Sequence, residues 1–317
     1  MLGRRTLTLG LSAGLAAPAI AQVARPVTFV VAYPAGGDTD AVARLFADRL
    51  SPRLGRQVVV ENRSGASGAV GTLYVMRAPA DGEVLLFAPS TFPVAPHVLR
   101  RGANYDPVND FTPVHMIATT PMILMASRQS GIRTLADVVS QARAGRLVGF
   151  GSPGSGSPMH IYGEMFNRAA GVRLSEIAYR GVGPVVNDLL AGSIAIGLVT
   201  PGAVSEQIRA GMLVPVAVSE AARSPVVPEV PTYKEAGYDL DVTTWWGLFG
   251  PRGLPAATVG TLNRHMNDVL ALPDVTERLR VLGAVPAGGP PAHLAEVNRV
   301  DYERFGRLVG ELGIHVE

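Results

Sequence analysis

Two glycine-rich stretches of this chain combine residue types that could bind an anion. The first, YPAGGDTD at residues 33–40, lies between an apolar run of strand length and apolar residues at helical spacing. The second, GSPGSGSPMH at residues 151–160, follows a predicted strand and opens a predicted helix. At such a turn, unpaired N–H groups and the positive end of the helix dipole face a bound group. We therefore predict an anion-binding turn in each half of the chain. For the first stretch, the alternative is an ordinary tight βα turn.

In the first stretch, the glycines and the polar residues have separate predicted roles. Gly36 and Gly37 leave the backbone free to turn tightly and to approach a ligand closely. Asp38 and Thr39 both have side chains suited to capping a helix. Asp38 and Asp40 could act as paired acids. The favoured interpretation is that one caps the helix and the other is a ligand contact or an anchor of the loop.

The second stretch adds hydroxyl groups to the backbone donors. Ser155 and Ser157 could donate hydrogen bonds to an anion, and His160 follows them in the sequence. A serine and a histidine could form a nucleophile–base pair. Helix geometry favours another role, in which His160 caps its own loop or packs at the wall of a cleft.

The motifs of several enzyme classes are missing from the sequence. The six histidines are scattered, cysteine is absent, and there is no HExxH motif. GxSxG and GxxxxGK[ST] do not occur, and Met159 stands where GxGxxG would need its third glycine. The sequence therefore predicts a binding protein with no metal, no cofactor and no catalytic residues.

Alternating strand and helix patterns place these turns in an α/β fold. Strands are predicted at residues 27–33, 57–61 and 84–88 with helices between them, which implies right-handed crossovers and a parallel sheet. Ligands of such sheets lie at the carboxyl ends of the strands. The residues expected along that edge are Asp38 to Asp40, Gly65 to Gly68, Ser90 and Thr91.

The alternation restarts in the middle of the chain. A strand is predicted at residues 122–126, and four more follow with helices between them. The run TWWGLF at residues 244–249 is predicted to return the chain to the first sheet. Its Trp245 and Trp246 either belong to the core or form the wall of a ligand pocket. Three helices with apolar stripes complete the chain, at residues 259–270, 275–282 and 294–312.

The N-terminus has the pattern of a secretory signal. Residues 1–21 contain Arg4 and Arg5, an apolar core too short to span a membrane, and small residues before a cleavage site at Gln22. The paired arginines also allow a twin-arginine signal. Without this segment the 28 Lys and Arg residues fall level with the 26 Asp and Glu residues, which disfavours nucleic acid and anionic membranes as partners. We expect a soluble exported protein without a lipid anchor.

Seven motifs span the mature chain. They are YPAGGDTD, VVVENRSGASGAVG, YDPVNDFTPV, GSPGSGSPMH, YRGVGPVVNDLLAG, SPVVPEVPTYKEAGY and WWGLFGPRGLP, in that order. Together they resemble the Bug-type solute-binding proteins of tripartite tricarboxylate transporters. The resemblance implies a two-lobed type II periplasmic binding fold, with a ligand carboxylate between the first βα loop and the glycine-serine loop of the second lobe. It also implies two partners, a large and a small membrane subunit that import the solute.

Carried over residue by residue, the resemblance places the ligand loops at residues 33–40 and 152–160. Two positions depart from the family pattern. Asp38 stands where a glycine or small residue is usual, and an acid there repels an anion unless it caps the helix or pairs with a ligand ammonium. Thr200 ends a strand that often ends in aspartate, so ligand identity does not transfer. The expected ligand-binding residues are Tyr33, Ala35, Gly36, Gly37, Asp38, Thr39, Asp40, Gly65, Ser67, Ser90, Thr91, Ser152, Gly154, Ser155, Gly156, Ser157, His160, Thr200 and Trp245.

We therefore predict an α/β protein with two lobes, each a mainly parallel sheet flanked by helices, and a ligand cleft between them. Residues 22–123 and 245–317 form the first lobe and residues 124–244 the second. The predicted function is that of a monomeric periplasmic receptor that delivers a small carboxylate to a tripartite tricarboxylate-type transporter. Two alternatives remain open: an exported enzyme that acts on a small organic acid through His160 or Asp40, and a ligand-sensing subunit for a membrane kinase.

Overall fold

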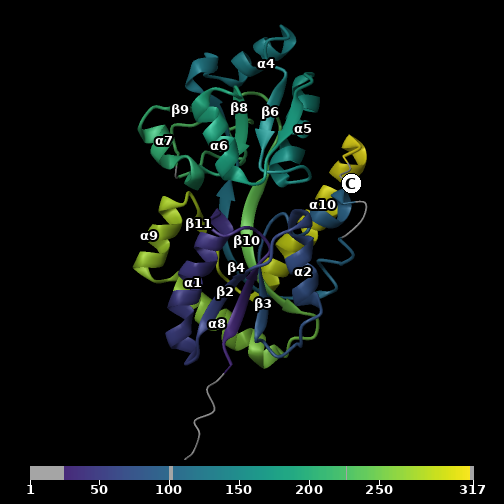
Figure 1. The fold of residues 1–317 in the computed structure, drawn as a ribbon, viewed down its shortest axis with the longest axis vertical. Helices are drawn as coiled ribbons and strands as arrows, with labels where there is room; N and C mark the ends of the chain where they lie inside the picture. Colours follow the sequence, from purple (N-terminus) through teal and green to yellow (C-terminus); the bar gives the residue numbers. More distant parts are fainter. Residues whose placement is uncertain (1–24, 100–102, 226, 315–317) are drawn as a thin grey trace, which may run out of the picture.

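The structure is a computed structural model that describes residues 25–99, 103–225 and 227–314. Two lobes lie one above the other along the long axis, and each is built on one β-sheet covered by helices (Figure 1). The predicted signal peptide at residues 1–21 lies outside the described residues. Within the part of the chain that is described, no helix is both long and apolar enough to cross a membrane.

The first sheet takes its strands from both ends of the described chain. They are β1 (Val27–Val31), β2 (Val58–Asn62), β3 (Val84–Pro89), β4 (Phe111–Pro121), β10 (Thr243–Pro251) and β11 (Val285–Pro286). Their order across the sheet is β11-β4-β10-β3-β1-β2. Because β10 pairs with β3 on one side and β4 on the other, the run TWWGLF does return the chain to this sheet, as predicted.

Helices cover both faces of the first sheet. They are α1 (Asp38–Leu54), α2 (Ala69–Met76), α3 (Ala95–Val98), α8 (Ala256–Leu270), α9 (Pro273–Val281) and α10 (Pro291–Leu312), with the 3₁₀ turn η1 (Ala66–Gly68) before α2. Apolar residues of α1, α8 and α9 form one core cluster with the sheet, and residues of α2, α3 and α10 belong to a second cluster. The three predicted C-terminal helices are confirmed, each beginning two or three residues earlier than expected.

The second sheet uses only strands from the middle of the chain. They are β5 (Ile123–Ser127), β6 (Gly149–Ser152), β7 (Ser175–Ala178), β8 (Ile196–Val199) and β9 (Leu213–Val218). Their order is β7-β6-β8-β5-β9. The helices of this lobe are α4 (Leu135–Arg143), α5 (Pro158–Ala170), α6 (Val182–Ala191) and α7 (Ser205–Arg209), with 3₁₀ turns η2 (Arg128–Ser130) and η3 (Pro201–Ala203).

Both sheets are mixed, so the two-lobed α/β fold is confirmed but the expectation that each sheet is mainly parallel is wrong. β1 is parallel to β2 and β3, and β6 is parallel to β7 and β8. The remaining pairings, which involve β4, β5, β9, β10 and β11, are antiparallel. The antiparallel strands include those next to the two crossings between lobes, where β4 leads directly into β5 and β10 returns the chain to the first sheet. The parallel strands belong to the strand–helix alternations that the sequence predicts.

The helix behind the first glycine turn forms for simple reasons. Val42, Phe46 and Leu50 recur every four residues on one side of α1, and all three are fully buried against the first sheet. The helix ends at Gly55, whose φ of 63° is the left-handed conformation that glycine adopts at helix ends. Burial of this stripe fixes the position of the α1 N-terminus relative to the strands.

The C-terminal helix α10 connects the lobes. Near its start, Leu294 belongs to the core cluster of the first lobe that contains Trp245. Near its end, Phe305 and Val309 belong to the core cluster of the second lobe, together with Tyr162 of α5. In Figure 1 the helix rises from the lower lobe toward the upper one.

Candidate functional site

The first glycine turn leads into α1 without a side-chain cap. Gly37 is the N-cap residue, and no side chain of the described residues caps this helix end with a hydrogen bond. Asp38 and Thr39 already lie inside the helix, so the prediction that they cap it is wrong. A cap must stand outside the helix, and the extended backbone of Gly37 (φ −82°, ψ 170°) takes that position. The N–H groups at this helix end therefore keep their capacity to bind an anion.

Asp40 holds the first turn in shape. Its Oδ2 accepts hydrogen bonds from the Gly36 N–H at 2.9 Å and from Arg44 Nε at 3.0 Å, and its Oδ1 accepts one from Asn62 Nδ2 at 2.9 Å. Burial by itself would raise the pKa of Asp40, but these hydrogen bonds outweigh it and lower the pKa below the usual value. The prediction that one of the two acids anchors the loop is confirmed.

The two tryptophans of β10 bind different elements, and only Trp246 contacts the first turn. Trp246 Nε1 donates to Thr39 Oγ1 at 3.0 Å, and Trp245 Nε1 donates to Asp301 Oδ2 of α10 at 2.7 Å. Both indoles are at most 3% exposed. Of the two roles left open for Trp245 and Trp246, the contacts favour the core. The Trp246 bond fixes the Thr39 hydroxyl next to the helix end.

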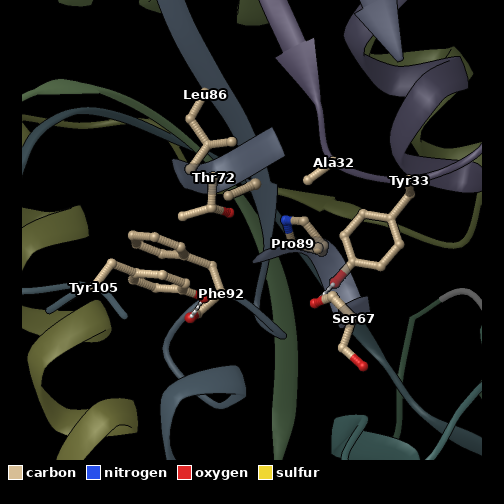
Figure 2. Close-up of a pocket in the computed structure, with 10 residues that line it drawn as sticks. Ala32, Tyr33, Ser67, Thr72, Leu86, Pro89, Phe92 and Tyr105 are labelled. Carbon is tan, nitrogen blue, oxygen red and sulfur yellow. Dashed lines mark hydrogen bonds between the residues drawn. The ribbon is translucent and has the colours of Figure 1, made fainter. Parts of the chain in front are cut away.

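A turn with strained backbone packs against Tyr33 at the end of the first strand. Gly65 and Gly68 have φ values of 141° and 92°, and between them Ser67 is also left-handed, with a φ of 49°. The Tyr33 hydroxyl donates to the Ser67 carbonyl at 3.2 Å, and a Cβ on Gly68 would come within 3.0 Å of that hydroxyl (Figure 2). Burial raises the pKa of Tyr33 to about 12, with a hydrogen bond to Thr91 acting against it.

Ser67 and Gly68 of this turn also line a cavity of about 10 Å³, the size of one water molecule. Tyr33, Thr72 and Tyr105 are among the residues that line it, and the Tyr105 ring stacks on Phe92 (Figure 2). The cavity is at the carboxyl ends of β1 and β3, where the Ser90 N–H also donates to the Trp245 carbonyl at 2.9 Å. The structure thus brings the first turn, Gly65 to Gly68, Ser90 and Thr91 to one edge of the first sheet.

The second glycine turn is capped by its own side chains. Ser157 is the N-cap of α5 and accepts from the His160 N–H at 3.2 Å. His160 Nδ1 accepts from the Gly156 N–H at 2.9 Å, so this nitrogen carries no proton. The prediction that His160 caps its own loop is confirmed. Gly156 is a required glycine, because its φ is 78° and a Cβ would come within 2.4 Å of Val98 Cγ1.

Glu176, which sequence reasoning missed, binds the serines of the second turn. The Ser155 hydroxyl donates to its Oε2 at 2.6 Å, and the Ser152 hydroxyl donates to its Oε1. His160 Nδ1 is 3.6 Å from the same Oε2 and already accepts from Gly156, so no hydrogen bond supports a Ser155–His160 nucleophile pair. The signal that could have revealed Glu176 is the point at which the strand begins. Glu176 lies in β7, whereas the predicted strand began at Ile177.

The two lobes meet at Asp38 and Thr200. The Thr200 hydroxyl, just after β8, donates to the Asp38 carboxylate at the start of α1. Burial raises the pKa of Asp38, and the Thr200 bond acts against this rise. Because β6 and β8 are parallel neighbours, Ser152 and Thr200 lie at the same edge of the second sheet. The Asp38–Thr200 contact therefore sets the first turn opposite the edge that carries the second.

The sequence-predicted residues thus fall into two groups. Those between Tyr33 and Thr91 lie at the edge of the first sheet, and those between Ser152 and Thr200 lie at the edge of the second. Ala35, Gly36 and Gly37 are exposed, whereas the Trp245 side chain is directed into the core. Among the described residues, no group of three or more His, Cys, Asp or Glu side chains could hold a metal ion.

Comparison with known sequences places the chain in a family. The sequence model of the tripartite tricarboxylate transporter family receptor, TctC, matches residues 42–314. The chain belongs to this family. BugT of Bordetella pertussis is 35% identical over 308 residues, which cover 95% of this chain and 94% of BugT.

Solved structures agree with this membership of the TctC family. The periplasmic binding protein BugD is 31% identical with a TM-score of 0.84, over 92% of this chain and 99% of BugD. Rpa4515 of R. palustris, solved with adipate, is 34% identical with a TM-score of 0.86, over 92% of this chain and 99% of its own. MatC from Rhodopseudomonas palustris, solved with bound malate, is 30% identical with a TM-score of 0.83, over 90% of this chain and 99% of MatC. The two-lobed architecture is thus that of periplasmic binding proteins.

Proposed function

We propose that this TctC-family protein is an exported receptor that captures a small carboxylate between its lobes. It delivers the ligand to a large and a small membrane subunit of a tripartite transporter. The hydrogen bond from Thr200 to Asp38 carries the proposal, because it sets the N-terminus of α1 opposite the ligand edge of the second sheet. Relatives solved with adipate and malate support the ligand class.

The ligand carboxylate is held chiefly by backbone groups. Neither residues 33–40 nor residues 151–160 contain Lys or Arg. The N-terminus of α1 lacks a side-chain cap among the described residues, so its N–H groups and the helix dipole supply the attraction. This attraction must exceed the repulsion from the Asp38 carboxylate at the same helix end, which the Thr200 hydroxyl engages. Each hydrogen bond to a carboxylate is worth about 1.5–3 kcal/mol. A few of them, less the cost of immobilising the ligand, leave roughly −8 kcal/mol, the affinity of a micromolar binder.

Closure of the lobes accompanies binding. We take residues 22–123 and 245–317 as the first lobe and residues 124–244 as the second, with a hinge where β4 meets β5 and where the chain enters β10. Export precedes this function, and the mature protein begins at Gln22 without a lipid. The intact mass of periplasmic material tests the export step, and full-length protein in the membrane fraction would contradict it.

A screen of carboxylic acids tests the binding function directly. Purified mature protein is melted with and without mono-, di- and tricarboxylates, aromatic acids and amino acids. A ligand at 100 times its dissociation constant adds about 2.7 kcal/mol to the free energy of unfolding. We expect at least one acid to raise the melting temperature and to be recovered chemically unchanged. If no acid does so, the proposed function is wrong; turnover of the acid would indicate an enzyme instead.

A further inference from the structure

The second glycine turn already holds a carboxylate, and that carboxylate is part of the chain. Glu176 accepts from both Ser152 and Ser155 through its two carboxylate oxygens. Its side chain is only 11% exposed, and its backbone is fixed in β7 beside β6. The hydroxyls that a ligand carboxylate would use in this lobe are therefore occupied by a group that cannot diffuse away.

Nearby backbone donors of the second turn are also engaged within the chain. The Gly156 N–H donates to His160 Nδ1 at 2.9 Å, and the Ser157 N–H donates to the Gly154 carbonyl at 3.0 Å. The Gly154 N–H donates to Ser152 Oγ at 3.2 Å. In the first turn the Gly36 N–H donates to Asp40, but within the described part of the chain no side chain caps the N-terminus of α1. The lobes are therefore unequal, with the open anion-binding groups on the first.

Among the described residues, neither lysine nor arginine neutralises the Glu176 carboxylate at the second turn. The imidazole of His160 is nearby, but its Nδ1 accepts from the Gly156 N–H. Over the described residues, no Lys or Arg nitrogen lies within 4.0 Å of the Glu176 carboxylate, and the same holds for Asp38. A dicarboxylate that placed one carboxylate on α1 and reached the second turn with the other would meet a fixed negative charge there. In a partly buried site such like charges repel strongly.

We propose that Glu176 determines the ligand charge that this receptor accepts, so that it prefers a monocarboxylate to the dicarboxylate of the same chain length. This inference rests on the proposed carboxylate-binding function and adds that the preferred ligand has one carboxylate, in contrast to the dicarboxylates adipate and malate of the two solved relatives. The single carboxylate binds at the N-terminus of α1, and the remainder of the ligand faces the second turn without a second anionic group.

The test compares acids that differ by one carboxylate. Calorimetry at neutral pH gives dissociation constants for hexanoate and adipate, for butyrate and succinate, and for any acid from the screen with its analogue that has one carboxylate more or fewer. The proteins are the wild type, E176Q, E176A and E164Q. Glu164 is the matched control because it lies in the same lobe, with Oε1 4.0 Å from His160 Nε2, and binds Asn167 instead of the serines.

We expect the wild type to bind the monocarboxylate of a pair at least tenfold more tightly. E176Q removes the charge and keeps the side-chain length. The ratio of the dissociation constants of the two acids should therefore change by at least tenfold in favour of the dicarboxylate. E176A also frees the Ser152 and Ser155 hydroxyls, so its shift should be larger. E164Q should keep the wild-type ratio. Circular dichroism and a cooperative melt check folding, and E176Q carries the test if E176A does not fold.

The possible failures are distinguishable. If the wild type and all variants bind no carboxylate, the proposed function is wrong and this inference with it. If acids bind but both Glu176 variants keep the ratio of E164Q, only the role of Glu176 is wrong. Equal weakening of both acids in E176A would likewise overturn it, because that result assigns Glu176 to the support of the loop instead of to the choice of ligand charge.

Discussion

The Thr200 hydroxyl of the second lobe donates a hydrogen bond to the Asp38 carboxylate of the first lobe, across 162 residues of sequence. The next residues make a second contact between the lobes. A Cβ on Gly202 would come within 2.4 Å of the Leu282 carbonyl oxygen, and one on Gly283 within 2.6 Å of Pro201 Cβ. At this contact, one polar bond and two glycines that leave room for backbone bring the lobes close together.

Replacement of Thr200 tests the polar bond. Thr200→Val keeps the shape of the side chain but leaves the Asp38 carboxylate without its donor, which costs about 1.5–3 kcal/mol for a bond to a charged group. If closure is coupled to binding, affinity for the acid found in the screen falls about 10- to 100-fold. Calorimetry measures this, with Thr200→Ser as the control that keeps the hydroxyl. Equal affinities of the two variants would contradict the prediction.

Replacement of Gly202 tests the close approach. Gly202→Ala places a methyl group against the Leu282 carbonyl oxygen, and backbone at that distance must move. Each lobe should still fold, but the lobes should stay further apart, so the radius of gyration with ligand should exceed that of the wild type and affinity should fall. Small-angle X-ray scattering measures the first effect. Gly260→Ala is the control, because a Cβ there meets no described atom within 4 Å. Equal radii of gyration of the two variants with ligand would contradict the prediction.

The two glycines of the first turn should differ in what they contribute. Gly36 has a φ of 85°, so Gly36→Val should lower the free energy of unfolding by about 1–2 kcal/mol. Gly37 has a φ of −82°, and a Cβ there meets only the Pro34 carbonyl oxygen at 3.7 Å. Gly37→Val should therefore fold normally and lose at least tenfold in affinity, because its side chain covers the end of α1. Urea unfolding and calorimetry separate the effects. Normal binding by Gly37→Val would mean that the site is elsewhere.

A buried histidine should make stability depend on pH. His115 in β4 is fully buried, and burial lowers its pKa to about 4, with a hydrogen bond to Asn267 acting against this effect. The unfolded chain, with a histidine pKa near 6.5, binds more protons than the folded protein between these values. The contribution of neutral His115 to stability is therefore complete above pH 6.5 and is lost as the pH falls toward 4, by about 3 kcal/mol in all.

Urea unfolding of the wild type and His115→Leu at pH 7.5, 5.5 and 4.5 measures this dependence. The stability of the variant relative to the wild type should rise as the pH falls, because leucine has no proton to bind. His265→Gln, which changes a partly exposed histidine of α8, should follow the wild type. A constant difference between His115→Leu and the wild type over this range would show that His115 does not titrate as expected.

Local signals in the sequence determined much of the architecture and the capping of the second glycine turn. The apolar spacing of Val42, Phe46 and Leu50 predicted α1. The run TWWGLF predicted the return strand, and the loop position of His160 predicted its cap. These features depend on residues within a few positions of one another, so periodicity and backbone preference encode them.

The tertiary structure decided how the side chains of the site are used. Only the pairing of β7 with β6 brings Glu176 to Ser152 and Ser155, and only the packing of the lobes brings Thr200 to Asp38. Gly37 is the N-cap because Asp38 lies inside the helix, and the Asp38 carboxylate binds Thr200 of the other lobe. Spacing along the chain says nothing about partners more than 20 residues apart, because strand order and lobe packing select them.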